Sequence, residues 1–302
     1  MPVNSRLPSH YCPASLGLDE PHTITQQLSA MLPFFPTIRW VERTDSTNAD
    51  LLELARSNSG QLIRPWILGA HLQDRGRGRA GRTWENRRGG HLMFSCAFDI
   101  FLPARQLPTL SPLAGVAVTE ALRALLPIQD QPKLSMKWPN DILWHDAKLA
   151  GILTEVTRAS TSASSSDHHV VIIGIGLNLN HARALSHALN RRVADWSEIV
   201  TEVPTLKHIS AAEIAAQIAK SWYQTLNEVT AFGFQNLPKR YQRVDGLFDR
   251  ALTIIDNGRT LYSGIGAGIN EQGQLLLRTA GQTHAISVGE VSVRSTHTPT
   301  AP

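Results

Sequence analysis

The chain has 302 residues, of which 42% are hydrophobic and 18% are charged, a composition that is ordinary for a soluble globular protein with ample core. The formal net charge is only +4, and the six arginines between positions 75 and 88 are enough to account for it. The charge therefore indicates a local site and excludes a general nucleic-acid-binding surface.

Cysteine usage and hydropathy point to the compartment. Cys12 and Cys96 are far apart and lack metal-binding spacing, and Cys96 lies in the apolar run 92–98, so a buried, reduced thiol is expected. The sequence has no signal peptide and no apolar stretch long enough to span a membrane. We therefore predict a cytoplasmic protein with no membrane partner and no metal-ligating residues.

Residues 1–36 are rich in proline, which occurs at positions 2, 8, 13, 21, 33 and 36. At most a short helix fits between Thr23 and Leu32, which is too little chain for two packed helices and a wing of a DNA-binding domain. We expect a partly disordered arm here and no nucleic-acid partner.

The segment Asp45-Ser46-Thr47-Asn48 is typical of a helix start. Thr47 is the expected N-cap, with Asp50 three residues later and an apolar face formed by the residues that follow. Capping alone would explain these residues. A helix N-terminus also offers free N–H donors, which suit a polar carbonyl of a ligand.

A predicted strand, 66–70, leads into Gln73 and then into the segment 74–84, which we call the arginine loop. Its three glycines let the backbone approach a ligand closely, and its four arginines carry planar forks that suit phosphate and carboxylate. We interpret it as a phosphate-clasping loop that is mobile until an anion fills it. A solvated basic loop or a nucleic-acid-binding arm would account for the same composition.

The sequence Lys137-Trp138-Pro139-Asn140-Asp141 predicts a strand that ends in a shaped loop, because Pro139 forces an extended or turn conformation before it. Asn140 and Asp141 can then face a ligand. Lys148 lies between the apolar runs 142–144 and 149–153, which favour a hairpin that turns near 145–147. A surface lysine beside a hairpin is the alternative.

The C-terminal half alternates buried elements with turns. Residues 158–169 predict a polar loop whose adjacent histidines do not suggest a metal site, and 170–178 predict a buried strand whose glycines allow close approach of a ligand. An amphipathic helix should follow Ser210, which forms a capping box with Glu213. After residue 246, short strands and a hairpin signal at 256–258 predict a small SH3-like barrel.

The motifs GRGRAGRTW, KWPND and KLAGIL, with Asp45–Asn48 before them and Gly174–Asn178 after them, together resemble the biotin–protein ligase family. The resemblance extends over about residues 38–295. It implies an α+β fold with a class II synthetase-like mixed sheet backed by helices, followed by a small SH3-like β-barrel. The implied organisation is an arm at 1–36 without the DNA-binding domain of some relatives, a catalytic biotin- and ATP-binding domain at 37–245, a C-terminal domain at 246–295 and a tail at 296–302.

The resemblance also implies a two-step reaction. Biotin is activated by ATP, with Mg²⁺ on the phosphates, to biotinyl-5′-AMP, and biotin is then transferred to a lysine of a biotin carboxyl-carrier domain of a carboxylase. We expect no transcriptional repressor role, and the resemblance leaves a homodimer open. A lipoate–protein ligase would share the fold and the chemistry but should lack the arginine loop together with KWPND. A nucleic-acid-binding module would leave KWPND and KLAGIL unexplained.

The resemblance assigns roles to residues that match the family motifs. Lys148 and Arg79 are the expected catalytic residues. The expected biotin-binding residues are Ser46, Thr47, Asn48, Gln73, Arg77, Gly78, Arg79 and Lys148, and the expected nucleotide-binding residues are Trp84, Asn140, Asp141 and Asn178. The chain departs from the family where Asp74-Arg75 replaces the commoner Gln-Ala or Thr-Ala-Gly before Gly76.

Overall fold

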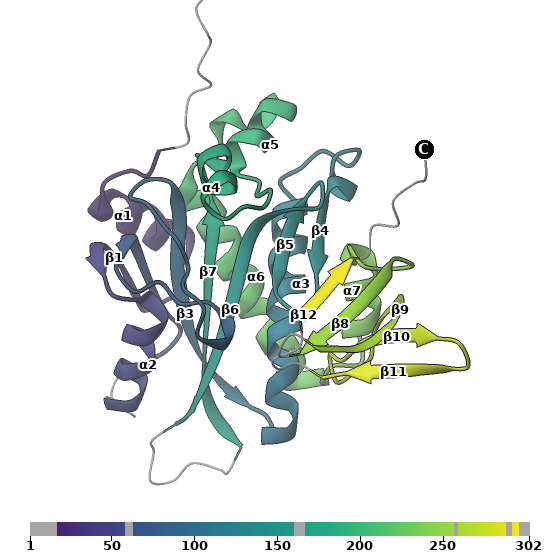
Figure 1. Cartoon of the computed structure of the whole chain (residues 1–302). Coiled ribbons are helices and arrows are strands. Elements are labelled where there is room, and N and C mark those ends of the chain that lie inside the picture. The colour runs from purple at the N-terminus through teal and green to yellow at the C-terminus, as the bar shows by residue number, and fades with distance from the viewer. Residues whose placement is uncertain (1–16, 58–62, 160–166, 257–258, 288–291, 296–302) are drawn as a thin grey trace, which may run out of the picture.

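The computed structural model describes residues 17–57, 63–159, 167–256, 259–287 and 292–295, which form a large mixed sheet and a smaller antiparallel sheet beside it (Figure 1). The seven strands of the large sheet lie in the order β1 (Thr37–Thr44), β2 (Trp66–Gln73), β3 (His91–Phe101), β7 (His168–Asn178), β6 (Ala147–Arg158), β5 (Asp141–Trp144) and β4 (Leu134–Lys137). The strands β1 and β2 are parallel, and every other neighbouring pair is antiparallel. The expected mixed sheet is therefore confirmed.

Helices cover both faces of this sheet, but unequally. One face carries the main core, to which α1 (Pro21–Met31), α3 (Leu110–Arg123), α6 (Ala211–Phe232) and α7 (Leu237–Val244) contribute buried side chains. The other face carries α2 (Thr47–Ser57), which packs over β2, β3, β6 and β7 around a smaller apolar cluster. Two short helices, α4 (Ala182–Ala188) and α5 (Trp196–Glu202), follow β7. Much of the α2 face thus remains open for a site.

The helix starts show which local signals hold. The capping box at α6 is confirmed, because the Glu213 N–H donates to Ser210 Oγ at 3.1 Å and the Glu213 carboxylate accepts from the Ser210 N–H. The start of α3 lacks such a box. That helix begins at Leu110 and continues directly from a 3₁₀ turn, 104–109, so no side chain caps it.

The central strands explain the apolar runs of the sequence. Both β3 and β7 are buried along almost their whole length, including Cys96, whose burial raises the pKa of its thiol. The expected polar loop at 158–169 is shorter than predicted. His168 and His169 already belong to β7, and His168 Nε2 lies 2.8 Å from an oxygen of Asp99. Cys12 and residues 160–166 lie outside the described residues.

The smaller sheet has the strand order β11 (Gln282–Ile286), β10 (Leu275–Thr279), β9 (Arg259–Ile269), β8 (Ala251–Asp256) and β12 (Ser292–Ser295), and all neighbours are antiparallel. Asp256 pairs with Arg259, which confirms the predicted hairpin, although Asn257 and Gly258 lie outside the described ranges. This is the small barrel-like domain that was expected. The Trp138 Nε1–H donates to the Gly273 carbonyl at 2.9 Å, and this bond joins the small sheet to the end of β4.

The described part of the N-terminal segment packs on the main core. Ile24 and Leu28 of α1 are buried there, next to β1 and α6. The rest of the expected partly disordered arm, residues 1–16, lies outside the described residues. Among the described helices, none has both the length and the apolar character needed to cross a membrane.

Candidate active site

Two adjoining cavities open on the sheet face that carries α2. The first encloses about 470 Å³ and the second about 920 Å³ of space outside protein atoms, open solvent included, and both are lined by Gly78, Trp84, Asn140 and Lys148. Of the predicted site residues, the first cavity contains Ser46, Thr47, Asn48, Gln73, Arg77, Gly78 and Lys148, and the second contains Arg79, Trp84, Asn140, Asp141, Asn178 and Lys148. The structure therefore brings every predicted residue to one continuous site. Arg79, expected beside biotin, lines the second cavity and not the first.

The start of α2 lies at the first cavity, one residue away from the predicted arrangement. The helix begins at Thr47, so Ser46 precedes it and accepts a long hydrogen bond from the Ala49 N–H at 3.4 Å. Thr47 is therefore the first residue of the helix and not the N-cap that the sequence suggested. Its N–H donates to Gln73 Oε1 at 2.8 Å, and its hydroxyl lies 2.7 Å from Ser95 Oγ.

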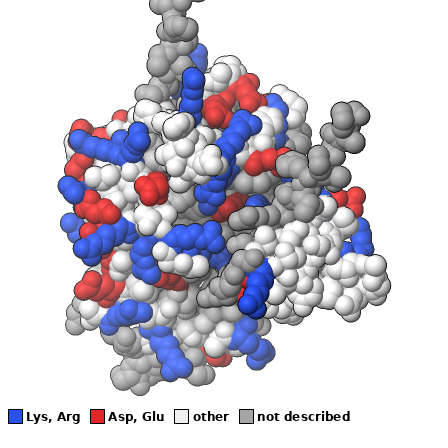
Figure 2. Space-filling model, viewed as in Figure 1, with Lys and Arg blue, Asp and Glu red and all other residues white. Residues whose placement is uncertain are grey.

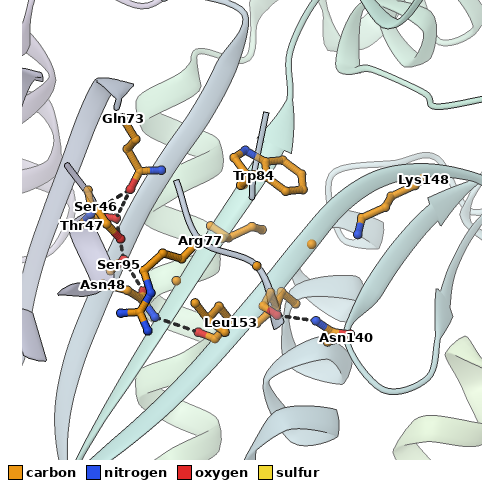
Figure 3. A pocket seen from close by; sticks show the side chains of 16 residues that line it. Ser46, Thr47, Asn48, Gln73, Arg77, Trp84, Ser95, Asn140, Lys148 and Leu153 are labelled. Atoms are coloured by element: carbon orange, nitrogen blue, oxygen red, sulfur yellow. Dashed lines mark hydrogen bonds between the residues drawn. The ribbon is translucent and has the colours of Figure 1, made fainter. Parts of the chain in front are cut away.

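The hydrogen bonds of the first cavity continue from Ser95 through Asn48 to a charged pair, Glu155 and Arg77. Ser95 Oγ donates to Asn48 Oδ1 at 2.6 Å, and Asn48 Nδ2 donates to the Leu153 carbonyl at 3.3 Å (Figure 3). Asn48 Nδ2 also donates to Glu155 Oε2 at 3.0 Å. The Glu155 carboxylate also pairs with Arg77 at 2.9 Å, so these bonds end on the arginine loop. Ser95 and Glu155 were missed in the sequence. The signals were a lone polar residue inside the apolar run 92–98 and an acid shortly after KLAGIL.

The arginine loop is folded as a small hairpin over the two cavities. Arg77 and Thr83 form an antiparallel bridge, the Trp84 N–H donates to the Gly76 carbonyl at 2.9 Å, and a 3₁₀ turn at 79–81 forms the tip. Asn86, which the sequence did not single out, closes the base by donating to the Gln73 carbonyl at 2.8 Å. Backbone pairing therefore gives the loop a defined shape.

The unusual pair Asp74-Arg75 ties the first residues of this loop to their neighbours. Asp74 accepts from Arg43 Nε at 2.7 Å, and Arg75 lies 3.6 Å from a carboxylate oxygen of Asp45. The Arg43 guanidinium lowers the pKa of the Asp74 carboxyl. These charges are solvent-exposed, so each ion pair contributes little stability and acts mainly on the direction in which the chain leaves β2.

Trp84 lies on a floor of glycines between the two halves of the site. Gly151 and Gly176 are paired on β6 and β7, and a Cβ atom on Gly176 would lie 2.3 Å from the indole ring. The buried Trp84 Nε1–H has no hydrogen-bond partner among the residues that the structure describes. The indole edge faces the ring of His91 at a centroid distance of 6.2 Å, and burial lowers the pKa of His91 to about 4.

Lys148 stands at the boundary of the cavities. Its Nζ lies 2.6 Å from Asp141 Oδ1 and 5.6 Å from the centre of the Trp84 ring, and its side chain is 20% exposed. The turn that positions it uses His145 and Asp146, both at positive φ, as the predicted hairpin requires. The alternative of a freely solvated surface lysine is therefore wrong. Figure 3 shows its ammonium directed toward Trp84 and Asn140.

The second cavity has a polar end and an apolar wall. Asn178 Nδ2 donates to the Ala194 carbonyl at 2.9 Å, while the buried Asn178 Oδ1 accepts no hydrogen bond from any described residue. The wall comes from a segment that sequence reasoning missed, namely Leu185, Leu189, Arg191 and Val193. An open acceptor beside an apolar wall and an indole suits a flat, hydrogen-bonding ring.

Basic groups surround the second cavity. Arg79 donates to Asn140 Oδ1 at 3.3 Å, and burial lowers the pKa of the Arg79 guanidinium. Burial also lowers the pKa of Lys137, with Asp141 opposing this shift and Lys148, among other cations, adding to it. On the face in Figure 2, Lys and Arg side chains gather over the large sheet and its loops, while the small domain shows mainly uncharged surface. The second cavity therefore favours an anion.

Two family profiles match the chain. Residues 40–178 match the biotin/lipoate A/B protein ligase family, and residues 248–294 match the biotin protein ligase C-terminal domain.

Characterised relatives match over most of the chain. It is 30% identical over 251 residues to the bifunctional ligase/repressor BirA of Escherichia coli K12, which covers 83% of this chain and 72% of that protein. It is also 30% identical over 255 residues to the biotin–[acetyl-CoA-carboxylase] ligase of Paracoccus denitrificans, covering 82% of this chain and 97% of that protein. Among solved structures, the biotin protein ligase of Aquifex aeolicus in complex with biotin and ATP is similar with a TM-score of 0.67 and 26% identity, covering 87% of this chain and 100% of that one.

Proposed function

This chain belongs to the biotin–protein ligase family, and we propose on that basis that its two cavities bind biotin and ATP side by side. The protein is an ATP-dependent biotin–protein ligase, which activates biotin to biotinyl-5′-AMP and transfers it to a lysine of a biotin carboxyl-carrier protein. The observation that supports this placement is the position of Lys148, whose ammonium borders both cavities and lies beside Asp141.

The first cavity is the proposed biotin site. Its hydrogen-bonded side chains are neutral and buried, as a site for an uncharged ring system requires. Thr47, Asn48, Gln73 and Ser95 offer the donors and acceptors there, and Ser46 lies at the helix start. Arg77 and Gly78 of the arginine loop cover the same cavity.

The second cavity is the proposed nucleotide site. Trp84 supplies an aromatic face, and the free Asn178 Oδ1 can accept a hydrogen bond from an exocyclic amine of a purine. Asn140 lines both cavities and accepts from Arg79 at 3.3 Å, so the α-phosphate would meet the carboxylate of biotin beside Asn140. Burial lowers the pKa of Arg79, and an anion beside it would offset the cost of burying the guanidinium charge.

The first chemical step joins two anions. A carboxylate oxygen of biotin attacks the α-phosphorus of ATP, an O–P bond forms, and the bond from that phosphorus to the β-phosphate breaks with its electron pair on the departing pyrophosphate. Lys148 is placed between the reacting groups, where an ammonium reduces their repulsion and follows the charge that moves toward the leaving oxygen.

The second step transfers biotin to protein. A neutral carrier lysine attacks the carbonyl carbon of the mixed anhydride, an amide bond forms, and AMP leaves with the electron pair of the broken C–O bond. Between the steps the arginine loop, with Arg79 at its tip, would keep water from the adenylate.

The nucleotide is expected to bring Mg²⁺ with it. This ion takes most of its ligands from phosphates and water, and usually only one or two from protein carboxylates. Asp141 and Glu85 line the second cavity and fit that requirement. The ion would neutralise phosphate charge when bound.

The remaining features follow the same proposal. We expect a cytoplasmic enzyme whose catalytic domain spans 37–245 and whose small domain spans 246–295, with the carrier domain of a carboxylase as protein partner and a homodimer as one arrangement to test. The repressor role in the name of BirA belongs to that protein, and we expect none here.

A biotin-dependent pyrophosphate-exchange assay tests the proposal. Purified protein with ATP, Mg²⁺ and labelled pyrophosphate should form labelled ATP when biotin is present, and a carrier domain added afterwards should gain biotin on its lysine. Lipoate is the matched substrate for the alternative ligase. Exchange with lipoate and none with biotin would contradict the assignment.

A further inference from the structure

Lys137 belongs to the KWPND motif but lines neither cavity, and its surroundings are unusual for a lysine. It ends β4 and is only partly exposed. Within the part of the chain that the structure describes, its ammonium makes no hydrogen bond and no ion pair. Lys133, just before the same strand, lies 2.8 Å from Asp130 and 3.3 Å from Glu202. The Lys133 ammonium is therefore paired with carboxylates, whereas the Lys137 ammonium is not.

The sheet register places Lys137 in line with the floor of the site. Across β7, β6, β5 and β4 the paired residues are Gly176, Gly151, Asp141 and Lys137. Residues directly opposite one another share a face of the sheet. Because Gly176 lies under Trp84, Asp141 and Lys137 extend the same row away from the glycine floor. At one strand spacing per step, Lys137 lies about 10 Å from Gly151.

At the β4 end of this row, positive charge is not matched by negative charge. Asp141 is the nearby carboxylate, and it is already held by Lys148 at 2.6 Å. The other charged groups that act on Lys137 are the cations Lys148, Arg191 and Arg250. Arg250 is paired with Asp146, and Arg191 lines the second cavity. A partly buried ammonium that faces only cations and a shared carboxylate is costly until an anion arrives.

We propose that Lys137 is a positioning residue that binds the β- and γ-phosphates of ATP and then the departing pyrophosphate. The inference rests on the proposed ligase function and adds a division of labour between two lysines. Lys148 lies at the boundary where the carboxylate meets the α-phosphate. Lys137, two strands farther out, lies where the rest of the triphosphate would extend. As the bond between the α-phosphorus and its leaving oxygen breaks, Lys137 holds the group that carries away the electron pair, and Arg191 provides a second cation.

This role separates the two half-reactions. Adenylation uses the β- and γ-phosphates, whereas transfer from preformed biotinyl-5′-AMP does not. Lys137→Met, which keeps an unbranched stem and removes the charge, should weaken binding of ATP and of pyrophosphate by about ten- to a hundredfold, the usual cost of losing a charged hydrogen bond. Transfer of biotin from synthetic biotinyl-5′-AMP to a carrier domain should be unchanged. Lys133→Met is the matched control and should alter neither.

The experiment measures pyrophosphate and ATP affinity by calorimetry, exchange rates against both ligands, and the transfer step, all on the full chain. Lys137→Arg should retain most of the affinity because it keeps a cation. Unaltered pyrophosphate affinity in Lys137→Met would overturn the proposal, as would an equal loss in both half-reactions or an equal loss in Lys137→Arg. If wild-type protein binds pyrophosphate through Lys137 but does not exchange it with biotin, the ligase function fails and the phosphate subsite stands.

Discussion

The two cavities of the site differ in how their polar groups are paired before a ligand binds. In the first, Thr47, Gln73, Ser95 and Asn48 are buried and hydrogen-bonded to one another, so their shape exists before a ligand arrives. In the second, the groups are charged or left with free hydrogen-bonding atoms, as at Asn178. The hydrogen bonds of the first cavity are therefore formed without ligand, whereas the charges and free hydrogen-bonding atoms of the second cavity gain their partners only when a ligand binds.

The difference follows from the ligands that the family uses. A neutral ring is recognised by fixed donors and acceptors, because leaving any of them unpaired in a buried place costs free energy. A triphosphate brings its own negative charge. Until ATP binds, the cations around its site can therefore form ion pairs with protein carboxylates, such as Lys148 with Asp141. The comparison predicts that changes in the first cavity affect biotin alone and changes in the second affect the nucleotide alone. The exceptions should be the residues that line both cavities, namely Gly78, Trp84, Asn140 and Lys148.

The largest effect should come from Lys148→Ala. Removing the ammonium between two reacting anions should slow adenylate formation by about a hundred- to a thousandfold, or roughly 3–4 kcal/mol, by analogy with the loss of an oxyanion-stabilising donor. Lys148→Arg should restore only part of the rate, because a planar guanidinium cannot replace a compact ammonium between Asp141 and the indole. Single-turnover adenylate formation measures both variants.

Lys207→Ala, at a position outside both cavities, is the control, and thermal melts check that each variant folds. A surface lysine would change stability by only about 0.5 kcal/mol and leave the rate intact. Two folded Lys148 variants that form adenylate at the wild-type rate would remove this residue from the mechanism and would break the link between the cavities.

Much of this site could be predicted because its chemistry is concentrated in short motifs. The arginine loop, Lys148 and the Asn140-Asp141 pair each combine a distinctive residue type with a local turn, and every one lies at the cavities. The hairpin that carries Lys148 and the capping box of α6 are likewise local and were predicted.

The parts that could not be predicted depend on pairing between distant strands. Ser95 reaches Asn48 because α2 packs over β3, β7 and β6, and a lone serine in an apolar run does not indicate its partner. The apolar wall at 185–193 carries no motif. The one-residue shift of the α2 start, which places Thr47 in the cavity, is within the uncertainty of any helix boundary argued from capping residues.

Two glycine variants should separate the first cavity from the residue that both cavities share, with intermediate effects. In Gly174→Ala the new Cβ would lie 2.1 Å from Asn48 Oδ1 and 2.8 Å from Ser95 Oγ, so biotin affinity should fall. In Gly176→Ala the Cβ would meet the ring of Trp84, which lines both cavities, at 2.3 Å, so the affinities for biotin and for ATP should both fall. Overpacking of this kind costs about 1–3 kcal/mol.

Calorimetric titration of each ligand into each variant gives four affinities, and Gly233→Ala checks the measurement, because no atom lies within 4 Å of its Cβ position, although its positive φ will cost some stability. The expected pattern is a loss of biotin affinity alone in Gly174→Ala and a loss of both affinities in Gly176→Ala. A similar loss of both ligands in Gly174→Ala would mean that the cavities respond as one unit.

The smallest effect should be the response to salt, which tests the charge contrast without any mutation. Exposed and half-exposed charge pairs weaken when the Debye length falls from above 10 Å to below 5 Å, between roughly 0.05 and 0.5 M salt. The dissociation constant of ATP should therefore rise about three- to tenfold over that range, since the second cavity holds its ligand by cations such as Arg79, Arg191 and Lys148. Biotin amide, which lacks the carboxylate that would meet Lys148, isolates the neutral network of the first cavity. Its dissociation constant should stay within about twofold, because hydrogen bonds between buried neutral groups are not screened.

The salt response of biotin itself should lie between those of ATP and biotin amide, and the difference between biotin and its amide reports the carboxylate alone. If biotin amide responded to salt as strongly as ATP does, the first cavity would have to recognise its ligand through charge, and the contrast between the two halves of the site would be lost.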